Sequence, residues 1–184
     1  LYQQPRSSYE VVLDEASGDL IPGLRLDRMA SDTTTVLQTS APISALGPGR
    51  SLRWQNSGSS AIDAQFIRVS AGACGTACGL DDRFRLRTYE TTYSIPRFNS
   101  AAQATVVLLQ NSSSDNVPGT VWFWSGSGSR LGSAPFDLAP RRSFVLNAGT
   151  VAGVPGQSGS ITVSHGGRYG SLAGKAVALE PATG

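Results

Sequence analysis

The chain has 184 residues, a formal net charge of +2 and 15% charged residues, against about 25% in a typical globular protein. This balance gives no strong attraction to nucleic acid or to anionic membranes, and the arginines are spread along the chain. No run of about 18 apolar residues is present, so we expect no membrane span. Abundant glycine and serine favour short strands joined by turns.

Twelve short segments are predicted as β-strands, because apolar residues recur in them, several alternate with period 2, and Gly, Pro and Asx turns separate them. No segment has an apolar period of 3.6 residues over ten or more positions, so helices should be minor. In chain order the predicted strands are 9–14, 24–29, 35–39, 51–56, 64–70, 83–89, 105–110, 120–124, 136–138, 143–146, 160–164 and 175–179.

The segment 92–99 divides these strands into two sets of six. It contains Pro96, which cannot donate to a strand ladder. We therefore expect an all-β chain of two tandem β-sandwich units, jelly-roll or immunoglobulin-like, over residues 1–92 and 93–184. Three aromatic residues flank this boundary, and we expect them to pack the units together: Tyr89, Tyr93 and Phe98.

Cys74 and Cys78 are the only cysteines, and the residues between them are small. Two cysteines without a nearby histidine cannot complete a zinc site, and the spacing is not that of a redox or haem motif. We predict a local Cys74–Cys78 disulfide, with reduced thiols as the alternative.

No catalytic constellation emerges from the sequence. His165 is the only histidine, and Ser158 lies in a glycine turn that lacks the Gly-x-Ser-x-Gly spacing of a nucleophile elbow. We therefore expect no enzyme activity. Five acids could join a calcium site or cap turns instead: the adjacent pair Asp81 and Asp82, and the loose group Asp14, Glu15 and Asp19.

Trp122 and Trp124 share one face of a strand, and Val121 and Phe123 share the other. One face should build the core. The tryptophan face is either a binding surface for sugar rings or a partner, or a second packed face covered by the facing sheet and the neighbouring unit. Lys175, the sole lysine, shares strand parity with apolar residues, and we expect its ammonium group to reach water.

The first half resembles the bacterial pre-peptidase C-terminal (PPC) domain. The resemblance rests on the order of segments 8–13, 18–20, 24–26, 50–52, 66–69 and 83–87. This order is similar to the family's first strand, Gly-Asp turn, Leu-x-Leu strand and late strand that ends in Arg-Val. It implies a β-sandwich or jelly-roll module that assists secretion, solubility or substrate binding. In some members N-terminal acids bind calcium, which here points to Asp14, Glu15 and Asp19. Through residues 172–181, the second half resembles a C-terminal unit of bacterial secreted proteins that carry PPC-like modules.

Together these features predict a secreted or cell-surface, non-catalytic binding, anchoring or stabilising module of a larger exported bacterial protein. We expect no cofactor, with calcium as the one alternative. The expected partners are a protein or a polysaccharide at the cell surface, or another copy of the chain. The alternative is a structural subunit of a surface assembly or filament, joined by sheet edges or strand exchange, in which residues 1–5 are donated to a neighbour.

Overall fold

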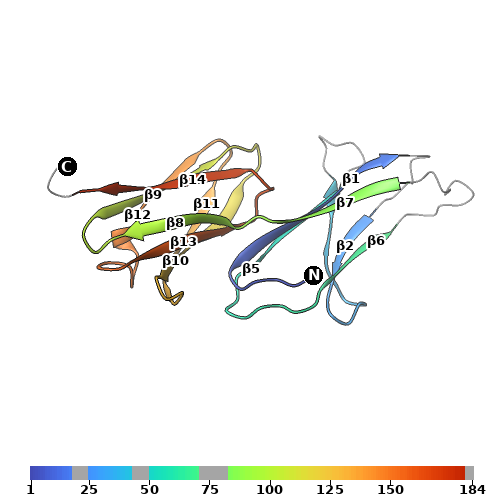
Figure 1. The fold of residues 1–184 in the computed structure, drawn as a ribbon. Coiled ribbons are helices and arrows are strands. Elements are labelled where there is room, and N and C mark those ends of the chain that lie inside the picture. The colour runs from blue at the N-terminus through green and yellow to red at the C-terminus, as the bar shows by residue number, and fades with distance from the viewer. Residues whose placement is uncertain (18–24, 43–49, 71–82, 181–184) are drawn as a thin grey trace, which may run out of the picture. The chain divides into compact units, whose positions relative to one another are not determined.

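The computed structural model describes residues 1–17, 25–42, 50–70 and 83–180 (Figure 1). Within these ranges the chain is all-β: strands form sheets of three or four, with one 3-10 helix (η2, Ala148–Thr150) and no α-helix. The predicted all-β, sandwich-like fold class is therefore confirmed. The chain separates into two compact units. Unit 1 comprises Leu1–Pro5 and Tyr9–Glu90, and unit 2 comprises Arg6–Ser8 and Thr91–Gly184.

Unit 1 contains a four-stranded sheet of order β4-β5-β1-β7 and a three-stranded sheet of order β3-β2-β6. The pairs β1–β7, β2–β6 and β4–β5 are nested, as in a long hairpin rolled up into a jelly roll. Its strands are β1 (Ser7–Ser17), β2 (Arg25–Met29), β3 (Val36–Thr39), β4 (Ala41–Pro42), β5 (Arg50–Asn56), β6 (Phe66–Ser70) and β7 (Arg83–Glu90).

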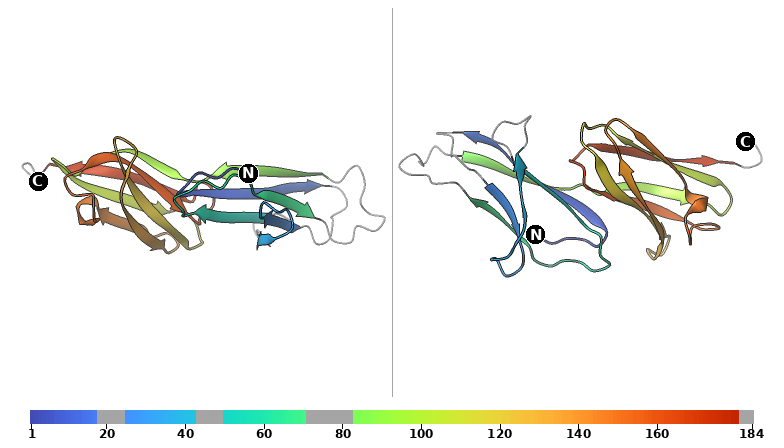
Figure 2. Two further views of the ribbon diagram at one scale, coloured as in Figure 1. Left: turned by 90° about the horizontal axis from the view of Figure 1, so that it is seen from below. Right: turned by 180° about the vertical axis from the view of Figure 1, so that it is seen from behind.

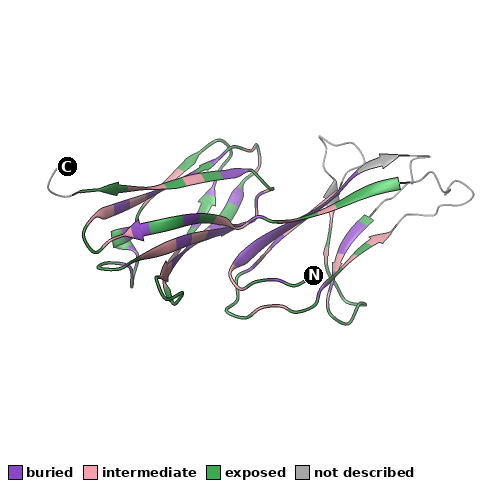
Figure 3. Cartoon of the chain, viewed as in Figure 1, coloured by how far each residue is buried: buried purple, intermediate pink, exposed green. Residues whose placement is uncertain are grey.

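In unit 1, the strand β1 is buried on both faces and contributes most to the core (Figure 3). The strand β7, at the edge of the same sheet, is largely exposed. Tyr9 stacks on Trp54 with ring centroids 5.8 Å apart. The N-terminal segment joins this unit: Gln3 is fully buried, pairs with the backbone of Ile62, and accepts a hydrogen bond from Trp54 Nε1 at 2.8 Å. The buried apolar residues are Tyr9, Val11, Leu13, Leu26, Leu52 and Trp54.

Unit 2 pairs a four-stranded sheet of order β11-β10-β13-β8 with a three-stranded sheet of order β12-β9-β14 (Figure 2). All of its strand pairs are antiparallel. Its strands are β8 (Tyr93–Asn99), β9 (Ala104–Asn111), β10 (Val117–Ser125), β11 (Arg130–Leu138), β12 (Ser143–Asn147), β13 (Ser158–His165) and β14 (Leu172–Leu179).

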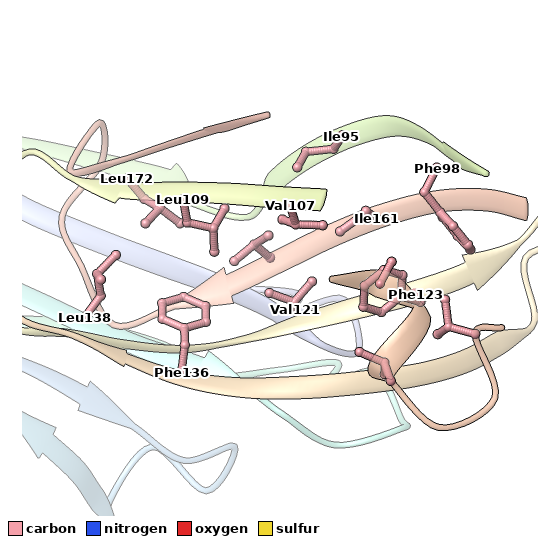
Figure 4. Packing of buried hydrophobic residues seen from close by; sticks show 14 of the residues in the cluster. Ile95, Phe98, Val107, Leu109, Val121, Phe123, Phe136, Leu138, Ile161 and Leu172 are labelled. Carbon is pink, nitrogen blue, oxygen red and sulfur yellow. The ribbon is translucent and has the colours of Figure 1, made fainter. Parts of the chain in front are cut away.

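The core of unit 2 lies between these two sheets, and both contribute to it (Figure 4). Val107 and Leu109 of β9 meet Val121 and Phe123 of β10 in one cluster. Phe123 is fully buried and packs edge-on against Phe98, with ring centroids 5.3 Å apart. Alternate residues of β9 and β10 therefore define an inner face, and the residues between them point outward.

Each of the twelve predicted strands has a counterpart, but a further strand occupies residues 93–99, where none was predicted. These residues form β8, which pairs with β13. Pro96 is tolerated because β8 is an edge strand of its sheet. Phe98, expected to pack between the units, belongs to the core of unit 2.

We predict that Phe123→Ala destabilises unit 2 by about 3–5 kcal/mol, because it opens a cavity in a fully buried cluster. Val145→Ala, at an exposed position of β12, should change the free energy of unfolding by less than about 0.5 kcal/mol. Urea unfolding of the whole chain measures both. Equal effects of the two substitutions would contradict the assigned core.

Candidate functional site

Trp122 and Trp124 lie on the outer face of β10, opposite to Val121 and Phe123, which enter the core. The indole Nε1 of Trp122 donates to Ser164 Oγ at 3.0 Å, and that of Trp124 donates to Thr162 Oγ1 at 2.8 Å. Both acceptors belong to the neighbouring strand β13. Trp122 is only 7% exposed, whereas Trp124 is partly exposed. The hydrogen bonds fix the two rings against the sheet.

The guanidinium group of Arg6 lies over both indole rings, 5.5 Å from the centroid of Trp122 and 5.6 Å from that of Trp124. These distances are within the range of cation–π attraction. Arg6 has φ 53°, a left-handed conformation that is unfavourable for a residue with a Cβ. Sequence reasoning missed this contact, because over 100 residues separate Arg6 from β10 and no local pattern links them.

Hydrogen bonds of Ser8 hold the segment that carries Arg6 in place. The backbone N–H of Thr91 donates to the carbonyl of Ser8 at 2.8 Å, and Thr91 Oγ1 donates to Ser8 Oγ at 2.9 Å. The N–H of Ser8 in turn donates to Thr92 Oγ1 at 3.0 Å. Ser8 and Thr91 are both buried, so these bonds fix the segment that carries Arg6 within unit 2.

His165, at the end of β13, interacts with the backbone of Thr91, to which Ser8 is bonded. It is 3% exposed, and its Nδ1 accepts a hydrogen bond from the Gly167 N–H at 3.1 Å. Burial lowers the pKa of His165 from 6.5 to about 4, although a hydrogen bond with the Thr91 backbone opposes the shift. His165 is therefore a neutral, fully packed side chain at neutral pH, and it braces Thr91.

Ser158 lies at the start of β13 and His165 at its end. Seven residues of extended strand separate them by about 23 Å, at roughly 3.3 Å per residue, so these two residues cannot form a nucleophile–base pair.

Asp27 of unit 1 is a buried carboxylate with several partners. It is fully buried on β2, where Arg25 Nε donates to Oδ1 at 2.7 Å and Arg68 donates to Oδ2 at 2.9 Å. Thr39 Oγ1 adds a third bond at 2.8 Å. Burial alone would raise the pKa of Asp27, but the bonds from Arg25, Arg68 and Thr39 outweigh it and the pKa is lowered. The carboxylate is thus a saturated acceptor that links three strands.

The predicted calcium residues lie mostly outside the described structure. Asp14 is buried on β1 and forms an ion pair with Arg87 of β7, while its Oδ1 has no hydrogen-bond partner. The Glu15 side chain and Asp19 lie outside the described residues, as do Asp81 and Asp82. Cys74 and Cys78 also lie outside them. Calcium binding and the disulfide stay predictions. Among the described side chains, no group of three potential metal ligands is present.

The outer face of the three-stranded sheet in unit 2 is partly exposed and carries mainly apolar side chains, with polar ones among them. Lys175 and Val145 flank Leu108 on either side, because both are its register partners. Val145 is 63% exposed and Leu179 is 51% exposed. A shallow depression beside Lys175 is lined by Leu108, Gln110, Ser143 and Ala173. We call this surface the β9 face; its apolar residues are Ala104, Val106, Leu108, Val145, Ala173, Val177 and Leu179.

A sequence signal for the β9 face exists in the run Val106-Val107-Leu108-Leu109, which is apolar at four successive positions. Such a strand has two apolar faces, and only one of them can be the core. The exposed Lys175 agrees with the expected solvent-reaching ammonium group. Exposed Arg141 and Arg142 lie in the turn that precedes β12.

Unit 2 is more cationic than the chain as a whole. It carries seven cationic and three acidic side chains, which gives a net charge of +4: Arg6, Arg97, Arg130, Arg141, Arg142, Arg168 and Lys175 against Asp115, Asp137 and Glu180. The remainder of the chain, unit 1, is therefore net −2. Binding chemistry in unit 2 consequently favours anionic or apolar partners over cationic ones.

Comparison of the chain with protein-family profiles, with curated proteins and with solved structures finds no match. The resemblance of residues 1–92 to the PPC domain stays a prediction. In the described residues, no helix is long and apolar enough to cross a membrane.

We predict that the chain loses stability as the pH falls from about 6.5 to about 4, because the unfolded state protonates His165 and the folded state does not. A shift of this size corresponds to about 3 kcal/mol, fully present above pH 6.5 and lost by pH 4. Chemical unfolding of the wild type and of His165→Gln between pH 4 and 7 measures it. Identical pH slopes for the two proteins would contradict the buried neutral imidazole.

Proposed function

We propose that the chain is a non-catalytic binding or anchoring module of an exported protein, and that unit 2 docks a partner through the β9 face. The observation that carries this proposal is the exposure of Val145 and Leu179 on a sheet face whose central strand is apolar. Contiguous apolar surface on a soluble domain marks an interaction site more often than chance exposure does.

The non-catalytic part of the proposal is supported by His165. A general base must reach the proton that it abstracts, and His165 is buried with its Nδ1 already accepting a backbone hydrogen bond. Asp27 is likewise saturated by arginine and threonine donors. Both side chains hold the fold together, and neither lies at an open site.

The charge of unit 2 favours an acidic protein partner at the β9 face. Lys175 is the cation nearest the centre of the face, and no hydrogen bond or ion pair engages its ammonium group in the described structure. Arg141 and Arg142 border the same sheet at the turn before β12. A partner with aliphatic side chains around a carboxylate would satisfy both the apolar area and the free ammonium group.

A second candidate is the structural subunit, in which two copies meet through their β9 faces. Face-to-face packing of two sheets, about 10 Å apart, would cover Val145 and Leu179 just as a partner would. Donation of residues 1–5 to a neighbour is less favoured, because Gln3 is already buried in unit 1 and paired with Ile62 of the same chain.

We predict that Val145→Gln combined with Leu179→Gln removes the chain from the surface of the cells that export it, because the substitutions place amides on the docking face. Surface-retained and released protein are measured by immunoblotting. The matched control is Val36→Gln combined with Leu37→Gln, two similarly exposed residues of unit 1. The control should be retained like the wild type.

Sedimentation velocity of the purified wild type separates the two candidates. A monomer at micromolar concentration supports docking to a different partner, whereas assembly that Val145→Gln abolishes supports the structural subunit. Equal surface retention of the β9-face variant and the wild type, together with a monomer, would contradict both uses of this face.

A further inference from the structure

The guanidinium group of Arg6 is held by aromatic rings rather than by an acid. A guanidinium has five N–H donors, and in the described structure Arg6 forms neither a hydrogen bond nor an ion pair. Its Nε is buried without an acceptor. A buried donor without a partner is unfavourable, and a strained φ of 53° adds to the cost. Such features concentrate at sites that hold a ligand.

The surroundings of Arg6 on the outer face of β10 are cationic and rich in hydroxyl groups. Arg130 of β11 is the register partner of Trp124 and is exposed. Ser133 of β11 stands opposite Trp122, and the exposed Ser94 of β8 stands opposite Thr162. Register partners lie on the same face of a sheet, so these groups surround the two indoles.

Acidic side chains do not compete for Arg6 on the described part of this face. The register places one acid there, Asp137, opposite Pro118 near the far end of β10. Its carboxylate already accepts a hydrogen bond from Asn116 Nδ2. An anion that reaches Arg6 and Arg130 from solvent therefore meets two cations and no opposing charge nearby.

We propose that Arg6, Arg130 and the exposed edge of Trp124 form a binding site for an acidic polysaccharide. Carboxylate groups of the polymer accept hydrogen bonds from the terminal guanidinium nitrogens of Arg6 and from Arg130, and its hydroxyl groups bond to Ser94 and Ser133. The C–H faces of the sugar rings pack on the exposed part of Trp124. Hydroxyl-rich surroundings favour a saccharide over an acidic peptide, which has few hydroxyl groups to match them.

This inference rests on the proposed binding function but uses the other sheet of unit 2, so the two are tested separately. Val145→Gln combined with Leu179→Gln should leave the affinity for the polysaccharide unchanged. Arg6→Gln should leave surface retention through the β9 face unchanged.

The test uses polygalacturonate as the probe, with neutral dextran and poly-L-glutamate as comparison polymers. Binding of each to the whole chain is followed by isothermal calorimetry and by tryptophan emission. We expect polygalacturonate to bind and to change the emission, because Arg6 contacts both indoles. Affinity should fall as salt rises, because the contacts are ionic and partly exposed. Dextran should not bind, and poly-L-glutamate should bind at least about tenfold more weakly, a difference of about 1.4 kcal/mol.

Three single substitutions locate the site. Arg6→Gln should weaken polygalacturonate binding about tenfold or more, since a charge-assisted hydrogen bond is lost. Arg130→Gln, at an exposed position, should weaken it by a smaller factor without affecting folding. Arg97→Gln removes the same charge from an exposed position of β8 and should leave affinity within about twofold of the wild type.

Three outcomes would overturn the proposal: no binding of polygalacturonate to the wild type, equal loss of affinity in Arg97→Gln and Arg130→Gln, or equal affinity for poly-L-glutamate. The last would show a site for acidic peptides instead. Should Arg6→Gln fail to fold, the comparison of Arg130→Gln with Arg97→Gln still decides the matter.

Discussion

Alternation of side chains along a strand is the constraint on which the structure of unit 2 depends. Successive residues of a strand face opposite sides of its sheet, so a strand with apolar residues at every position exposes an apolar face unless something covers it. Both β9 and β10 contain a run of four successive apolar residues, 106–109 in β9 and 121–124 in β10. Their inner faces meet in one core. Their outer faces differ in what lies over them: Arg6 lies over the tryptophans of β10, whereas Val145 beside β9 is exposed.

On the outer face of β10, a single arginine lies over the two tryptophan rings. Arg6 reaches Trp122 and Trp124 because Ser8 is tied to Thr91 and Thr92, and because His165 packs against the Thr91 backbone. The sole histidine of the chain is thus a buried side chain that braces the Thr91 backbone. The outer face of β9 has no such cover in the described structure, and Val145 and Lys175 stand in solvent. One face therefore presents a cation on aromatic rings, and the other presents aliphatic side chains around a lysine.

Strand positions and the all-β class could be predicted because period-2 alternation and turn residues are local signals. Pro96 misled the prediction, since a proline rules out a central strand but not an edge strand such as β8. Trp122 and Trp124 could be predicted as a pair because they share one face of a strand. The contact of that face with Arg6 could not be predicted, because Arg6 is remote in sequence. The open β9 face followed from the order of the strands in the sheets, which alternation alone does not specify.

The most direct test of this account is to measure the solvent accessibility of methyl and indole groups in the intact chain. NMR with a soluble paramagnetic gadolinium chelate measures it. The account predicts strong relaxation enhancement for the methyl groups of Val145 and Leu179, and little for the indole N–H of Trp122. Protected methyl groups at Val145 and Leu179, or a strongly relaxed Trp122 indole, would contradict it.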